Sequence, residues 1–423
     1  MITIANYHIN EPIYESTNSL VSRGLRKEDN QPVILKVLKE DYPTPEELTR
    51  YRQEYEITKS LNLDGVIKTY GLEKSQNTLV IVLEDFGGES LKQLMTERCL
   101  TVKEFLPRAI QIADSLGQIH AANIIHKDIN PSNIVFEPTT EQLKIIDFGI
   151  ATVLPRENPT LKNPNQLEGT LAYISPEQTG RMNRSLDYRT DLYSLGVTFY
   201  ELLTGQLPFN SDSPMELVHC HIAKTPAPVC SIKPDVPSII SDIVMKLMAK
   251  NVEERYQSAF GVKADLEKCV ENLGSLDSEN LQGFQNLRTL TFKLAQNDFS
   301  GKFQIPQKLY GRENELDTLL QAFERVTEEE KNPTGKGEMM LVAGYSGVGK
   351  TALVHEVHKP MTEKHGHFAA GKFDQYQRNI PYSALTQAFN NFCNYLLTES
   401  TEELIRWREK ILTAIGNNGQ VLI

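Results

Sequence analysis

The sequence predicts an α+β domain, with an antiparallel β lobe and a helical lobe, followed by an incomplete α/β domain. Three observations lead to this prediction. Short apolar runs alternate with turns over the first hundred residues, as in a sheet of paired strands. Apolar stripes at helical spacing follow, up to about residue 270. Beyond residue 338, an apolar run leads directly into a glycine-rich loop, the order of a strand, a loop and a helix.

Composition narrows the class of protein. At 423 residues, with 40% hydrophobic and 23% charged residues, the chain is typical of a globular protein with more than one domain. A net charge of -11 gives no support to a nucleic-acid partner. The five cysteines form no CxxC pair, which favours a reducing, cytoplasmic location. We find no secretory pattern and no apolar run of the roughly 18 residues that a membrane helix needs, so we expect no membrane partner.

The strand predicted at 33–38 contains one lysine, Lys36. On strand statistics alone, a solvent-facing side chain is the ordinary interpretation. However, a helix is predicted from Pro45 to Leu61, and Glu54 lies near its middle. A lysine that grips the α- and β-phosphates of a nucleotide, held by a glutamate of the next helix, follows the same order. We therefore favour the functional interpretation of Lys36 and Glu54.

A polar loop, 126–133, and two short apolar strands follow, and the second strand ends in Asp147-Phe148-Gly149. This pattern predicts a hairpin with Asp128, Asn133 and Asp147 at one end. Such groups position a hydroxyl and hold magnesium against a triphosphate.

The helical lobe is predicted independently of these polar residues. Thr101 and Glu104 form a capping box, the pattern that begins many helices. Two apolar stripes at helical spacing, one after residue 108 and one after residue 191, predict buried helices that hold the loop of Asp128 in place. The stripes consist of Ala109, Ile112, Ala113, Leu116 and Ile119, and of Leu192, Leu195, Phe199 and Leu202.

Together these motifs resemble the eukaryotic-type serine/threonine protein kinase family over residues 7–270. Further matches to the family are its hinge at 83–86, with Leu83 as gatekeeper, its activation-segment end at 169–177 and its central buried helix from Asp191. Arg255 matches the ion-pair partner of Glu177. The resemblance implies a bilobal protein kinase fold.

The resemblance also implies site roles, with ATP and Mg²⁺ as cofactors and a protein serine or threonine as substrate. Asp128 would accept the proton of the substrate hydroxyl, while Asn133 and Asp147 would hold the metal. Glu84 and Phe86 of the hinge would receive the adenine. Thr170 would pack against Asp128, which favours serine/threonine over tyrosine specificity.

Three departures from the family pattern weaken this assignment. In the loop that covers the phosphates, Tyr14, Ser16 and Ser19 occupy the places of glycines, which let backbone amides approach phosphates closely. Lys127 replaces an arginine that, in the family, binds a phosphate on the activation loop. Asn130 replaces a lysine that helps to neutralise the transferred phosphoryl group. We therefore keep a nucleotide-binding pseudokinase scaffold as the alternative. The residues expected around the nucleotide in this loop are Ile13, Ser16, Ser19 and Val21.

A polar linker is predicted at 271–306, with one docking strand near Leu290-Thr291-Phe292. In the second domain, 307–423, a helix is predicted from Leu309 to Val326 and a buried strand at 339–343. The strand leads into a complete phosphate-binding loop pattern. Loop amides would cradle phosphates, Lys350 would reach the β- and γ-phosphates, and Thr351 would ligate Mg²⁺. The fixed positions of the pattern are Gly344, Gly349, Lys350 and Thr351, with Gly347 between them.

The box at 310–313 makes this second domain similar to AAA- or STAND-type ATPases. No acid-ended apolar run follows Thr351, so we expect poor ATP hydrolysis and a chain that is the N-terminal piece of a longer protein. The overall order resembles bacterial hybrid serine/threonine–histidine kinases, in which a kinase and an ATPase precede GAF sensor and histidine-kinase modules. Elsewhere, His219-Cys220-His221 lacks further ligands at metal spacing, so we expect it to be structural.

Overall fold

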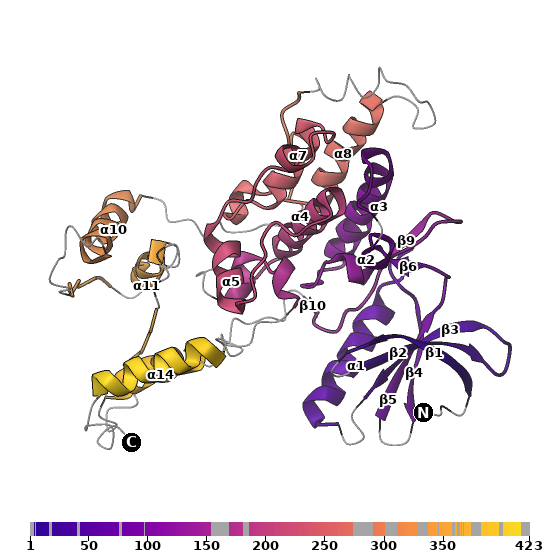
Figure 1. Cartoon of the computed structure of the whole chain (residues 1–423), viewed down its shortest axis with the longest axis horizontal. Coiled ribbons are helices and arrows are strands. Elements are labelled where there is room, and N and C mark those ends of the chain that lie inside the picture. The colour runs from indigo at the N-terminus through magenta and orange to yellow at the C-terminus, as the bar shows by residue number, and fades with distance from the viewer. Residues whose placement is uncertain are drawn as a thin grey trace.

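The structure is a computed structural model that shows two lobes, one built on a sheet and one built on helices (Figure 1). It describes residues 4, 6–16, 19–39, 43–75, 78–96, 98–153, 169–180, 186–273, 291–300, 311–327, 337–345, 347–357, 360–361, 364, 366, 368–373, 382–396 and 401–415.

The first lobe is an antiparallel five-stranded sheet with the order β1-β2-β3-β5-β4. Its strands bury apolar side chains on both faces. Val33, Leu35 and Val37 lie in one small core, while Leu79 and Ile81 lie in another that includes Tyr51 of the helix α1. The elements are β1 (Tyr7–Glu15), β2 (Ser19–Arg26), β3 (Pro32–Leu38), α1 (Pro45–Ser60), β4 (Thr69–Ser75) and β5 (Thr78–Glu84).

Local chemistry explains where α1 begins. Thr44 accepts a hydrogen bond from the amide of Glu47, whose carboxylate in turn bonds the amide of Thr44, and Pro45 opens the first turn. This box satisfies amides that a helix start otherwise leaves without partners. It fixes the register of α1, and thereby the turn that places Glu54 on the buried side.

The second lobe is organised around α4 (Arg189–Thr204), a helix that is buried from Arg189 to Leu203. Around it, α3 (Val102–Ala121) packs along α8 (Ala259–Leu273), where Gly117 lies directly under the ring of Phe260. The predicted apolar stripes of α3 and α4 lie in this core, and the predicted capping box of α3 is present. The remaining helices of the lobe are α2 (Leu91–Leu94), α5 (Pro214–Ala223), α6 (Val229–Ile232) and α7 (Ser238–Leu247).

Short strands and single turns carry the polar loops between the lobes. The predicted hairpin is confirmed, since β8 and β9 pair antiparallel with Ile134 opposite Ile145. The other elements of this region are β6 (Glu89–Ser90), β7 (Ile124–Ile125), η1 (Pro131–Asn133), β8 (Ile134–Glu137), β9 (Gln142–Ile145), β10 (Thr152–Val153), η2 (Leu171–Tyr173), η3 (Pro176–Thr179) and η4 (Val252–Glu254).

A buried ion pair closes the helical lobe, as the sequence predicted. Both terminal nitrogens of Arg255 donate to the Glu177 carboxylate, at 2.6 and 2.8 Å, and Thr190 donates a third bond to it. Burial raises the pKa of Glu177, but the charge of Arg255 and these bonds outweigh it, so the net pKa is lowered. The pair joins η3 to the loop before α8.

Beyond residue 310, the described elements are helices: α10 (Glu313–Thr327), α11 (Lys350–His355), α13 (Ser383–Leu396) and α14 (Thr401–Ile415). The predicted buried strand at 339–343 is wrong. This stretch has no regular structure, and Met339 and Leu341 are 94% and 89% exposed. A central strand is buried only when other strands pair with it, and in the described part of the chain beyond residue 310 no strand is present.

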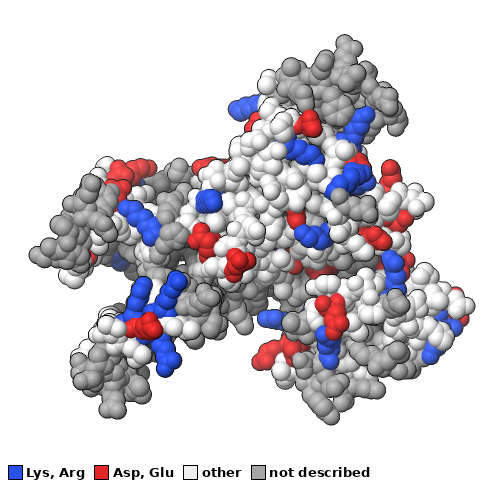
Figure 2. Space-filling view, viewed as in Figure 1, with Lys and Arg blue, Asp and Glu red and all other residues white. Residues whose placement is uncertain are grey.

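The described stretch after α8 does not contain the docking strand that we predicted. Thr291 and Phe292 form no strand, although this segment does lie against the helical lobe, while Leu290 is outside the described residues. Acidic and basic side chains are interspersed over the face shown in Figure 2. Among the described helices, none is both long enough and apolar enough to cross a membrane.

The buried pair gives a prediction about stability. Arg255→Ala leaves Glu177 as an uncompensated buried charge, so we expect the two lobes to lose about 3–5 kcal/mol of unfolding free energy. Lys263→Ala is the control, because its pairs with Asp114 and Glu267 are partly exposed and contribute at most about 1 kcal/mol. Urea unfolding followed by circular dichroism measures both. Equal midpoints for the two variants would contradict the prediction.

Candidate active site

Three charged groups meet between the lobes. The Lys36 ammonium of β3 lies 2.6 Å from a Glu54 oxygen of α1 and 2.9 Å from an Asp147 oxygen. Burial lowers the pKa of Lys36, but the charges of Glu54 and Asp147 outweigh it and raise the net pKa, so Lys36 stays charged. The solvent-facing interpretation of Lys36 is wrong, because its side chain is buried.

The loop of Asp128 is fixed by hydrogen bonds at both carboxylate oxygens. Asn133 donates to one oxygen at 2.8 Å and to the Asp128 carbonyl at 2.9 Å. The backbone amide of Thr170 donates to the other oxygen at 2.9 Å. Gly169 makes this possible, since its φ is +99° and a Cβ there would crowd the Lys127 carbonyl at 3.1 Å. The structure thus brings Thr170 against Asp128.

The adjacent turn, 147–149, is also held by contacts. Asp147 has a left-handed φ of +64°, and one of its oxygens accepts from the amide of Gly149 at 3.2 Å. Phe148 is buried, and the centre of its ring lies 4.8 Å from the centre of the His126 ring in an edge-to-face arrangement. His126 also bonds the Ile146 carbonyl. The strained Asp147 is therefore held from both sides, as is usual at functional turns.

One residue with a large role was not predicted as part of the site. Asp191, at the start of α4, is buried and accepts from the amides of His126 and Lys127, at 2.8 and 2.7 Å. His120 bonds the same carboxylate at 2.9 Å. The sequence placed Asp191 only at a helix start, since a side chain that bonds a loop 64 residues earlier leaves no local pattern.

The two departures in the loop have structural roles. Lys127 is buried, with a left-handed φ of +69°, and its ammonium donates to the Thr152 hydroxyl at 3.0 Å. Asn130 is also buried, caps η1 through the amide of Ser132 and donates to the Asp128 carbonyl at 3.1 Å. Neither substitution disturbs Asp128, and Asn130 helps to shape its loop.

The glycine-free loop is closed by serine side chains. The Ser16 hydroxyl accepts from the Ser19 amide at 2.9 Å and lies 3.0 Å from the Ser19 hydroxyl. Tyr14, the most surprising substitution, is 60% exposed, and Ile13 is exposed too. Val21 pairs in register with Lys36. The structure therefore places all four predicted loop residues on β1, β2 or the turn that joins them, and Val21 is the one that pairs with the lysine.

At the hinge, the Glu84 carboxylate bonds to other parts of the protein. It accepts from Lys144 at 2.5 Å and from the Lys68 amide at 2.7 Å. The Lys144 ammonium also lies 5.2 Å from the centre of the Phe86 ring. The Glu84 side chain therefore joins β5 to β9 through an ion pair.

The second predicted site lies at the start of α11. Lys350 donates to the carbonyls of Gly344 and Tyr345, at 2.9 and 2.8 Å, so the loop wraps around its ammonium. Gly347 and Gly349 have left-handed φ values of +82° and +88°. Thr351 is exposed on the first turn. Ser346 lies outside the described residues.

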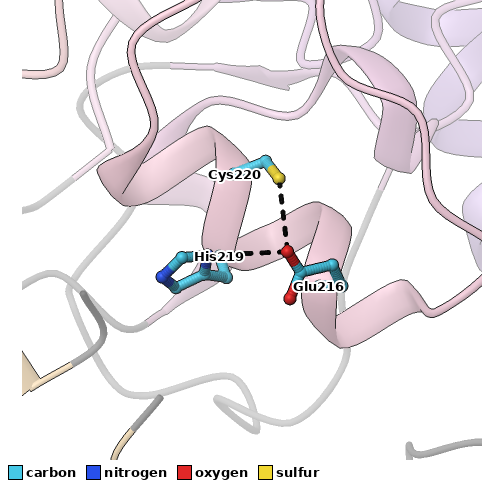
Figure 3. A group of neighbouring side chains, drawn as sticks. All are labelled: Glu216, His219 and Cys220. Carbon is cyan, nitrogen blue, oxygen red and sulfur yellow. Dashed lines mark hydrogen bonds and ion pairs between the residues drawn. The ribbon is translucent and has the colours of Figure 1, made fainter. Parts of the chain in front are cut away.

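A group of possible metal ligands also occurs on α5, where Glu216, His219 and Cys220 lie within one helical turn (Figure 3). The Cys220 sulfur is 3.8 Å and the His219 Nδ1 4.0 Å from the same Glu216 oxygen. Burial and the neighbouring Glu216 raise the pKa of Cys220, which favours the neutral thiol. No fourth donor joins them among the described residues, and we keep the structural interpretation.

The geometry defines a class of protein, and comparison with known families agrees with it. The protein kinase domain family matches residues 7–265, and the AAA ATPase domain family matches residues 308–421. The chain belongs to the protein kinase family, with an antiparallel β lobe and a helical lobe, and an AAA-type domain follows. Both matched domains are ATP-using domains.

Three relatives are similar to this chain, which spans only part of the length of each of them. The chain is 32% identical to hybrid signal transduction histidine kinase G of Dictyostelium discoideum over 399 residues, 76% of this chain and 11% of that protein. It is 33% identical to a probable serine/threonine-protein kinase of Clostridium perfringens over 270 residues, 63% of this chain and 38% of that protein. It is 32% identical to serine/threonine-protein kinase PknB of Mycobacterium tuberculosis over 252 residues, 58% of this chain and 40% of that protein.

The charge group between the lobes gives a second prediction. Lys36→Met leaves the buried Glu54 beside Asp147 without its cation, so we expect a loss of about 3–5 kcal/mol of stability. Adding Glu54→Leu removes the stranded charge and should recover most of this loss. Thermal unfolding of both variants measures the effect. If the double variant were the less stable of the two, the charges would not be coupled as described.

Proposed function

We propose that this chain is an ATP- and Mg²⁺-dependent serine/threonine protein kinase that acts in signal transduction. The observation that supports this most is the contact of the Lys36 ammonium with the carboxylates of Glu54 and Asp147. In addition, both carboxylate oxygens of Asp128 accept hydrogen bonds that hold this side chain in place. We expect these groups to act on the triphosphate and on the hydroxyl. A transfer site needs this positioning because the enzyme itself does little covalent chemistry.

Each group has a distinct role in the proposed transfer. The substrate hydroxyl attacks the γ-phosphorus and passes its proton to Asp128. The bond between the γ-phosphorus and the oxygen that bridges it to the β-phosphate breaks, and ADP leaves with that oxygen and its electron pair. Lys36, fixed by Glu54, positions the α- and β-phosphates. Thr170 holds Asp128 in its orientation through its amide and borders the place of the incoming hydroxyl.

The donor set near the phosphates suits a magnesium ion. Asp147 offers carboxylate oxygens and Asn133 an amide oxygen, since its nitrogen is the atom that donates to Asp128. Hard oxygen donors of this kind are those that Mg²⁺ prefers. When bound, the ion would neutralise charge on the β- and γ-phosphates.

We propose a second ATP-binding module in residues 307–423, separated from the kinase domain, 7–270, by the stretch 271–306. Loop amides from Gly344 to Gly349 would cradle its phosphates, Lys350 would bind them, and Thr351 would ligate Mg²⁺. Hybrid histidine kinase G is similar to 76% of the chain, a larger share than the kinase match at 7–265, so we expect sensor or histidine-kinase modules as partners in a longer protein. We expect this protein in the cytoplasm.

The pseudokinase scaffold is the second candidate, and the glycine-free loop is the observation that favours it. Ser16 and Ser19 bond each other and leave fewer backbone amides free to face phosphates than a glycine loop does. On this alternative, the chain binds nucleotide and recruits partners without transfer.

Phosphate transfer from labelled ATP distinguishes the two candidates. We expect the wild-type chain to label itself or a generic protein substrate, and Asp147→Ala to lose at least about 100-fold of this activity because the metal loses its carboxylate. Lys350→Ala is the matched control, since it removes a phosphate-binding lysine from the other module and should leave the transfer step intact. Labelling by wild type no greater than by Asp147→Ala would refute the kinase proposal.

A further inference from the structure

Residues 291–300, here called the strap, return to the helical lobe after α8 has ended. Three apolar side chains of the strap pack against the core of that lobe: Phe292, Leu294 and Ala295. The ammonium of Lys268, on α8, lies 5.1 Å from the centre of the Phe292 ring. The family match stops at residue 265, so nothing in the family comparison includes this segment.

The middle of the strap is bonded to a buried acid of α8. The amide of Ala295 donates to Asp265 at 2.7 Å, and Tyr256 donates to the same oxygen at 2.8 Å. Asp265 is fully buried. Ala295 has a left-handed φ of +62°, a conformation that costs free energy in a non-glycine residue. The bond to Asp265 and the burial of the apolar side chains offset that cost.

The end of the strap fits the start of α8. The Asp298 carboxylate accepts hydrogen bonds from the amide of Gln257 and from the hydroxyl of Ser258. The Ser258 hydroxyl in turn accepts a hydrogen bond from the amide of Gly261. A Cβ at Gly261 would lie only 2.3 Å from an Asp298 oxygen, so only glycine leaves room for this carboxylate. Glycine is unfavourable inside a helix, and its presence at this position is explained by the strap.

The last described residue of the strap reaches toward the active site. The Ser300 hydroxyl lies 2.9 Å from the Tyr188 hydroxyl. Tyr188 is buried just before α4, and its ring lies 5.4 Å from that of His120. His120 bonds Asp191, the carboxylate that holds the amides of the catalytic loop. Strap and loop are thus joined by one continuous set of packed and bonded side chains.

We propose that the strap is an integral part of the kinase domain and positions the catalytic loop through Tyr188. Asp298 anchors the strap on α8, and Ser300 is the positioning residue. Because the chain continues from the strap toward the P-loop module, the strap is also the place where that module can act on the kinase. The catalytic part of this proposal rests on the proposed function, whereas the structural part does not.

Hydrogen–deuterium exchange of the full chain tests the structural part without any activity. Asp298→Ala should speed amide exchange in peptides covering 257–265 and 291–300 about tenfold, because a charged acceptor is lost from two donors. Gly261→Ala should do the same by displacing Asp298, although this substitution ordinarily stabilises a helix. In the Asp298→Ala background, Gly261→Ala should therefore slow exchange instead. Equal effects of Gly261→Ala in both backgrounds would overturn the anchor.

Steady-state kinetics tests the positioning part. Ser300→Ala should lower kcat about tenfold with KM for ATP unchanged, since the nucleotide contacts are elsewhere. Asp242→Ala, on the exposed face of α7, is the matched control and should behave as wild type. Unchanged kcat in both Ser300→Ala and Asp298→Ala would overturn the positioning role. A wild-type chain without transfer activity would instead refute the proposed function and leave the exchange results to decide on the strap.

Discussion

The buried carboxylate of Asp191 is the contact on which the active site depends most. It lies at the start of α4, a helix with almost no exposed residue, and therefore has no freedom to move. Its two oxygens accept the amides of His126 and Lys127 and a bond from His120. A buried carboxylate is tolerated only when such donors satisfy it. The Asp191 side chain thus fixes the loop of Asp128 to the buried helix α4.

The second constraint is electrostatic and joins the lobes. Lys36 comes from the sheet, Glu54 from α1 and Asp147 from the turn after β9, so their contact requires both lobes and the helix to be in register. Burial makes each charge costly alone and strengthens their mutual attraction. The site therefore assembles as a unit, and the departures at Lys127 and Asn130 are accommodated because they lie outside this unit.

Much of the fold could be predicted because it depends on local pattern. Neighbouring residues alone determine the capping box of α3, the period of the apolar stripes and the order of the motifs around Asp128 and Asp147. The features that were predicted wrongly or missed depend on contacts between residues that lie far apart in the sequence. The apolar run at 339–343 looks like a buried strand by composition, yet burial of a strand is decided by the strands beside it. Likewise, the burial of Lys127 by Thr152, and the docking of Asp298 beside Gly261, leave no sign in the local sequence.

We propose that Asp128, held by Asn133 and Thr170, takes the proton of a substrate hydroxyl in a site that binds ATP independently of it. The most direct test compares transfer and binding in Asp128→Asn, which keeps the shape of the side chain. We expect ATP to bind this variant with unchanged affinity by calorimetry, while phosphate transfer falls by about 100-fold or more. Wild-type transfer rates in this variant would show that Asp128 does not act on the hydroxyl.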